Sequence, residues 1–112
     1  MAYNIQLANR VREYLARIPD LEIEEKKMFG GLAFLINGKM CVNVSRDNLM
    51  CRFHPGRLDE LAEKKGFVQM VMNGKTYKSY CYVEPQGVRT DKALAFWIEV
   101  CLAFNEEIKN ES

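Results

Sequence analysis

Two Asn-Gly dipeptides, Asn37-Gly38 and Asn73-Gly74, constrain the fold of this chain more than any other feature of its sequence. Asn-Gly between two apolar segments is the strongest short-range signal of a two-residue β-hairpin, because both turn residues must adopt a positive φ. Residues 32–36 and 39–45 flank the first dipeptide, and residues 67–72 and 75–83 flank the second. The sequence therefore predicts two hairpins within a mostly antiparallel sheet.

Apolar residues at helical spacing precede and follow these strands. Residues 3–18 predict a helix that Pro19 ends, and a closing helix begins after Thr90 and extends to about Ile108. Between the hairpins, residues 57–65 predict a short helix, with Gly66 as its left-handed cap. Arg46-Asp47 predicts one more turn, which leads into a strand at residues 48–53. Whether residues 26–29 form a further strand is left open.

A chain of 112 residues has the size of one domain, here residues 1–112. The predicted fold class is α+β, with a two-layer arrangement, a mostly antiparallel sheet and the helices on one side. The order of elements is α-β-β-β-α-β-β-α, with a fourth early strand if residues 26–29 form one.

Net charge and hydropathy exclude several classes of partner. The 16 Lys and Arg residues nearly cancel the 15 Asp and Glu residues, so we expect no direct binding of nucleic acid. Basic residues that could contact phosphates have acidic neighbours, which favours a solvated surface; they are Arg10, Arg12, Arg17, Lys64 and Lys65. No segment has 18 consecutive apolar residues and the first ten residues do not resemble a secretory signal, so we expect a cytoplasmic protein without membrane contact.

The cysteines and the single histidine do not predict a reactive site. Cys41, Cys51, Cys81 and Cys101 occur singly, without the C-x-x-C spacing of a zinc ribbon. If Arg46-Asp47 is a two-residue turn, strict alternation places Cys51 in the core and Cys41 on the opposite face, where the two thiols cannot share a metal or form a disulfide. His54 lies three residues after Cys51, at the end of the strand, which predicts a solvated loop residue. We therefore expect no catalytic residue, no metal and no cofactor.

The same alternation predicts an apolar surface. It assigns Ala33, Leu35, Met40, Val42 and Val44 to the core beneath the helices. The opposite face then carries a candidate interaction surface, made of Phe34, Ile36, Cys41, Met50, Tyr80 and Tyr82. An open apolar patch of this kind marks an interaction site. We expect it to pair with a second copy in a homodimer, while a helix that crosses to cover it is the alternative left open.

The motif Met28-Phe29-Gly30-Gly31 carries a family resemblance, together with LINGKMCV, NLMCRF, KSYCYVEP and the closing helix with Trp97. In combination they resemble the TfoX/Sxy N-terminal domain family over nearly the whole chain. The resemblance implies a secretion-chaperone-like fold and a regulator of bacterial competence genes, but no active-site residue. Full-length members carry a C-terminal helical domain, so the resemblance is to a stand-alone domain lacking it. We expect Gly30 or Gly31 to occupy a bulge or a positive φ.

These observations predict a non-enzymatic interaction and regulatory module. We expect it to form a homodimer and to have a regulatory protein as a further partner. The alternative is a small-molecule-binding or enzymatic domain with a cleft near the Gly30-Gly31 bend and the strand at residues 77–82. A polar-lined pocket with convergent titratable groups would favour this alternative. A broad apolar face would favour the module.

Overall fold

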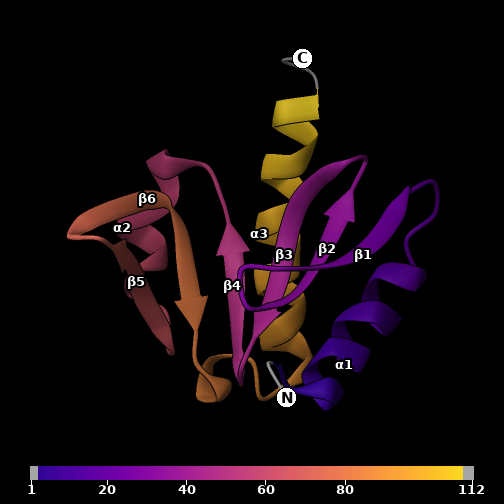
Figure 1. Cartoon of the computed structure of the whole chain (residues 1–112), viewed down its shortest axis with the longest axis horizontal. Coiled ribbons are helices and arrows are strands. Elements are labelled where there is room, and N and C mark those ends of the chain that lie inside the picture. Colours follow the sequence, from indigo (N-terminus) through magenta and orange to yellow (C-terminus); the bar gives the residue numbers. More distant parts are fainter. Residues whose placement is uncertain (1–2, 110–112) are drawn as a thin grey trace.

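The computed structural model describes residues 3–109 as a two-layer α+β fold. One layer is an antiparallel sheet of six strands in the order β1-β2-β3-β4-β6-β5, and the helices form the other layer behind it (Figure 1). The strands are β1 (Ile23–Met28), β2 (Gly31–Ile36), β3 (Lys39–Ser45), β4 (Asn48–Arg52), β5 (Phe67–Met72) and β6 (Lys75–Val83). The helices are α1 (Ile5–Ala16), α2 (Leu58–Leu61) and α3 (Asp91–Lys109), with short 3-10 turns η1 (Pro55–Arg57) and η2 (Pro85–Gly87).

The predicted fold class is confirmed, and the open question of an early strand is settled by β1. Both Asn-Gly turns form as predicted: φ is 54° at Asn37 and 84° at Gly38, and 53° at Asn73 and 75° at Gly74. Positive φ at both central residues matches the right-handed twist of the strands that leave the turn.

Side-chain caps define where the two long helices begin. The Oδ1 atom of Asn4 accepts a hydrogen bond from the backbone N–H of Leu7 (2.9 Å), and α1 begins at the next residue after Asn4. The Oγ1 atom of Thr90 accepts from the backbone N–H of Ala93 (3.0 Å), which confirms the predicted cap of α3. Within residues 3–109, none of the helices combines the length and hydropathy that crossing a bilayer requires.

The main core lies between the helices and the sheet. Helices α1 and α3 bury apolar stripes against one face of the strands; the largest contributions are Leu15, Trp97 and Ile98. The side chain of Asn105 on α3 is also buried, and its Nδ2 atom donates to the carbonyl oxygen of Ile36 on β2 (3.0 Å). This bond holds the C-terminal half of α3 against the sheet.

A β-bulge in β3 overturns part of the predicted register. Leu35 pairs with Met40, as the two-residue turn requires, but Phe34 pairs with Val42, so Cys41 is an extra residue in β3. A bulge of this kind interrupts strict alternation, because two residues of one strand oppose a single residue of its partner.

The prediction that Phe34, Ile36 and Cys41 lie on the uncovered face is therefore wrong. All three belong to the helix-side core, with exposed fractions of 0%, 0% and 1%. Three residues that were assigned to this core lie on the opposite face instead: Ala33, Leu35 and Met40. The remaining assignments to the core, Val42 and Val44, are confirmed.

Candidate functional site

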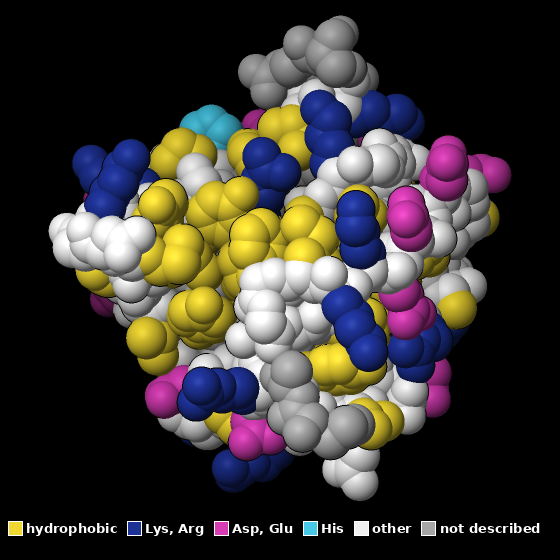
Figure 2. Space-filling view, in the orientation of Figure 1, with side chains coloured by type: hydrophobic (Ala, Val, Ile, Leu, Met, Phe, Trp, Pro, Cys, Tyr) yellow, Lys and Arg dark blue, Asp and Glu magenta, His cyan; other side chains and the backbone are white. Residues whose placement is uncertain are grey.

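The reverse face is the side of the sheet that faces away from the helices. Its buried residues form a separate cluster to which no helix within residues 3–109 contributes: Ala33, Met40, Met50 and Met70. Figure 2 shows this face, with hydrophobic side chains gathered over β4, β6 and β5 and charges of both signs toward β1. In the described part of the chain, no helix crosses to cover it.

A groove of about 400 Å³ lies in this apolar region. Its floor is formed by Met50 and Met70, which are 3% and 2% exposed, whereas Phe29 and Met72 at its rim are 56% and 44% exposed. The full lining consists of Phe29, Met50, Met70, Met72, Tyr77, Tyr80 and Tyr82. Methionine is flexible and polarisable, so such a lining can adapt its shape to an apolar partner.

An irregular stretch of β6 positions two of the three tyrosines. Gln69 pairs with Cys81 while Val71 pairs with Thr76, so residues 77–80 form an arch opposite a single residue of β5. The Nε2 atom of Gln69 donates to the carbonyl oxygen of Tyr77 (2.8 Å) and thereby satisfies a backbone group that the sheet leaves unpaired. Within the arch, the rings of Tyr77 and Tyr80 meet edge to face, with centroids 6.4 Å apart.

The turn between β1 and β2 places Phe29 at the groove. Met28 pairs with Gly31, and Phe29 and Gly30 have φ of 56° and 72°, so the expectation of a positive φ at one of these glycines is confirmed. Figure 1 shows this turn reaching across the front of β3 toward β4. A left-handed conformation is unfavourable for phenylalanine, which makes an exposed Phe29 at this position conspicuous.

Close backbone contact holds the turn against the sheet. A Cβ atom at Gly31 would lie 2.2 Å from the carbonyl oxygen of Val44 and 2.7 Å from Oδ1 of Asn43. Only glycine allows the chain to approach β3 this closely.

Two cationic side chains contact the aromatic rings of the groove. The Arg52 guanidinium lies 5.9 Å from the ring centroid of Tyr80, and the Lys75 ammonium lies 5.7 Å from that of Tyr77. The lining itself contains no Asp, Glu, His, Cys or Lys. The groove can therefore bind apolar groups, but its lining offers no acid–base pair for proton transfer.

The structure separates the predicted surface residues into two groups. Met50, Tyr80 and Tyr82 line the groove, whereas the other three predicted residues belong to the helix-side core. The predicted surface did not include Phe29, Met70, Met72 and Tyr77, although the alternative of a cleft pointed to the bend after Phe29 and to the strand that holds Tyr77. Period-two alternation along β5 could have identified two of these residues, because Val68, Met70 and Met72 are two residues apart.

All four cysteines lie in the helix-side core as free thiols, so the prediction that Cys41 points away from Cys51 is wrong. Burial raises the pKa of the Cys41 and Cys51 thiols, and the neighbouring Cys101 raises both further. Among residues 3–109, no three Cys, His, Asp or Glu side chains are placed to hold a metal ion.

His54 is exposed, and its Nδ1 atom accepts a hydrogen bond from the backbone N–H of Gly56 (2.9 Å). Cys51 is fully buried, so the two side chains do not form a nucleophile–base pair.

The fold is that of a small α+β domain with helices on one face of its sheet and an apolar groove on the other. The family model of the TfoX N-terminal domain matches residues 13–105, a range that contains all six strands and every residue of the groove lining. The chain belongs to the TfoX N-terminal domain family. No curated protein and no solved structure is significantly similar to it.

Proposed function

We propose that this domain is a non-enzymatic interaction module that pairs with a second copy of itself through the reverse face. The observation that carries the proposal is the uncovered groove with Phe29 exposed beside it. Large exposed apolar patches are rare on monomers and mark sites of association.

The shape of the face favours a second copy over an unrelated partner. An isologous interface joins a surface patch to itself, so one face must supply both the protruding group and the hollow that receives it. Here the same face carries the exposed ring of Phe29 and the methionine floor formed by Met50 and Met70. A two-fold axis through the reverse face would bring each Phe29 toward the groove of the other copy.

The alternative of a small-molecule or enzymatic domain has weaker support. The groove does lie beside the Gly30-Gly31 bend, where this alternative expected a cleft. Its lining is apolar, however, and tyrosine hydroxyls are its only titratable groups. A regulatory role through a further protein partner, in the cytoplasm, fits a chain with four buried free thiols.

Light scattering after size-exclusion chromatography tests the proposal. We expect a mass near twice 13.0 kDa at micromolar concentration. Phe29→Asn should shift the protein toward monomer without loss of thermal stability, because asparagine tolerates the left-handed conformation better than phenylalanine does. Met72→Gln should act in the same direction.

Ile5→Gln is the matched control, because Ile5 is an exposed apolar residue on α1, away from the reverse face. It should leave the mass unchanged. A wild-type protein that remains monomeric at high concentration, or a dimer that survives both groove variants, would show that this face is not the self-association surface.

A further inference from the structure

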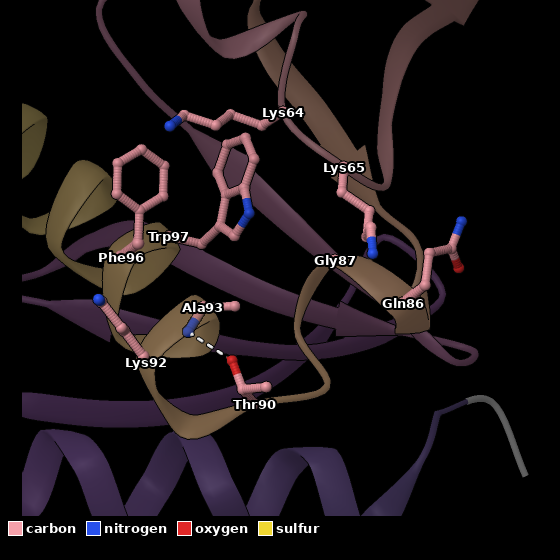
Figure 3. A pocket seen from close by; sticks show the side chains of 9 residues that line it. All are labelled: Lys64, Lys65, Gln86, Gly87, Thr90, Lys92, Ala93, Phe96 and Trp97. Carbon is pink, nitrogen blue, oxygen red and sulfur yellow. Dashed lines mark hydrogen bonds between the residues drawn. The ribbon is translucent and has the colours of Figure 1, made fainter.

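A second hollow, of about 430 Å³, lies at the N-terminal end of α3 and shares no residue with the reverse-face groove (Figure 3). Three separate segments form it: the stretch after α2, the 3-10 turn η2 and the first two turns of α3. Its lining includes the side chains of Lys64, Lys65, Gln86, Thr90, Lys92 and Trp97.

Two glycines bring the first two segments into direct contact. A Cβ atom at Gly87 would lie 2.3 Å from the carbonyl oxygen of Lys65, and one at Gly66 would lie 2.9 Å from the Cα atom of Gly87. The carbonyl oxygen of Gly66 also accepts a hydrogen bond from the backbone N–H of Glu84 (2.8 Å). The position of Lys65 relative to η2 is therefore fixed by the backbone.

The hollow concentrates positive charge. Its lining holds three lysines and no acidic residue, in a chain whose formal net charge is only +1. None of the three forms an ion pair with a carboxylate among residues 3–109. Lys64 lies over the ring of Phe96 instead, with its ammonium 4.7 Å from the ring centroid.

Acidic groups near the hollow are engaged elsewhere. Glu60 pairs with Arg57 (2.8 Å), and Asp91 pairs with Arg10 (3.5 Å). Glu84 accepts a hydrogen bond from the side chain of Gln86 (3.0 Å). Lys64 also interacts electrostatically with Glu60, so Lys65 and Lys92 are the lysines whose charge is left for a ligand. The N-terminal end of α3 adds the positive end of the helix dipole.

Trp97 supplies an independent sign that a ligand belongs in this hollow. Only 2% of the residue is exposed, yet its indole N–H has no hydrogen-bond acceptor within the described part of the chain. Figure 3 shows the indole nitrogen on the side of the ring that faces Lys65 and Gly87. This nitrogen is not among the buried unpartnered polar atoms of residues 3–109, so it is open to the hollow, where it can donate to an anion.

We propose that this hollow binds the phosphate group of a small organic phosphate. The phosphate lies between the ammonium group of Lys65 and the indole N–H of Trp97, from which it accepts, while the organic part packs against Phe96 and Ala93. A site of this volume is in the range that holds a small molecule. Phosphate fits this donor set because its several oxygens can accept from the Lys65 ammonium and the Trp97 N–H at the same time.

Trp97 is the only tryptophan of the chain, so its fluorescence reports directly on the hollow. The probes are inorganic phosphate, adenosine monophosphate and uncharged adenosine, each added at constant ionic strength. We expect saturable changes with adenosine monophosphate, inorganic phosphate or both, and none with adenosine. If adenosine monophosphate binds more tightly than inorganic phosphate, the ligand is an organic phosphate. The reverse order of affinities indicates free phosphate.

Variants assign the response to the lysines. The double variant Lys65→Gln/Lys92→Gln should weaken binding by roughly tenfold, because it removes the charge-assisted hydrogen bond of Lys65 and a second positive charge of the hollow. Lys78→Gln removes an exposed lysine of β6 that does not line the hollow, and it should bind like the parent. Calorimetry with Trp97→Phe, which keeps a ring but removes the donor, should show weaker binding of the same probe.

The inference is overturned if neither anion gives a saturable response at millimolar concentration. Equal binding by the double variant and the parent would also overturn it. So would an equal loss in Lys78→Gln, since that result would reflect net charge rather than this hollow.

Discussion

The Nδ2 atom of Asn43 donates a hydrogen bond to the carbonyl oxygen of Met28 at 3.1 Å. This bond joins the middle of β3 to the end of β1, beneath the turn that carries Phe29. Asn43 is 0% exposed, and its Oδ1 atom has no hydrogen-bond partner among residues 3–109. A buried polar side chain therefore fastens the β1–β2 turn to the reverse face.

Asn43→Asp should destabilise the protein in a pH-dependent way. Burial disfavours the charged carboxylate, so the pKa of the introduced carboxyl group in the folded state should lie above its unfolded value of about 3.9. Below this unfolded pKa the carboxyl group is protonated and can donate to the carbonyl oxygen of Met28, and the loss of stability should be small. The loss should grow as the pH rises from the unfolded pKa through the folded-state pKa and reach its full value above it.

Urea denaturation from acidic to neutral pH measures this effect, and Asn48→Asp in a half-exposed position is the control. A loss of stability in Asn43→Asp that does not depend on pH would contradict the role of the Asn43 donor.

The two glycines of the turn should respond differently to substitution. Gly30 has φ of 72°, and no atom lies within 4 Å of the place that a Cβ atom would take, so Gly30→Asn should cost well under about 1 kcal/mol. Gly31→Ala should cost about 1–3 kcal/mol, because its Cβ atom would collide with backbone of β3 that cannot move freely. Thermal melts of both variants check this ranking, and equal melting temperatures would contradict it.

The hairpins could be predicted from sequence because their signals are local. Asn37-Gly38 and Asn73-Gly74 need only their own backbone conformations to define two turns, and both formed as predicted. The cap of α3 is similarly local, since Thr90 and Ala93 are three residues apart. The structure has both turns and this cap at the residues where the sequence predicts them.

The bulge at Cys41 could not be predicted in the same way. Regular pairing and bulged pairing both fit the turn, and they differ in which residues around the hairpin share a face with Val42 and Val44. The hollow beside Trp97 was also missed, because it depends on the contact between Gly66 and Gly87, which are far apart in sequence. Lys64 and Lys65 were interpreted as a solvated surface for the same reason.

Tyr14 should stabilise the protein over a defined pH range. Its hydroxyl donates to the carboxylate of Glu99, and this bond is the main reason that the pKa of Tyr14 rises to about 12, with burial a smaller cause. Because the folded-state pKa lies above the ordinary value of 10.0, the contribution is complete below about pH 10 and is lost as the pH rises toward 12.

The difference in melting temperature between the parent and Tyr14→Phe should therefore be constant up to about pH 10 and shrink above it. Absorbance titration of Glu99→Gln should show the pKa of Tyr14 returning toward its ordinary value. An unchanged tyrosine titration in Glu99→Gln would contradict this assignment.

The four thiols should react slowly in the native protein. Cys41, Cys51, Cys81 and Cys101 are each at most 1% exposed, and burial raises the pKa of Cys41 and Cys51, which disfavours their reactive thiolates. A chromogenic disulfide reagent should label all four in denaturant and none rapidly in buffer. A thiol that reacts within seconds in the native state would show that part of the core opens readily.

The bulge at Cys41 has a consequence for the curvature of the sheet. If this residue were deleted, Leu35 could still pair with Met40 and Phe34 with Val42, so every side chain could keep its present face. A bulge bends its strand and increases the local twist, and we expect the shortened strand to lie flatter. The depth of the reverse-face groove would then depend on an inserted residue that does not line it, so a single insertion or deletion in β3 could reshape this surface without changing its chemical composition.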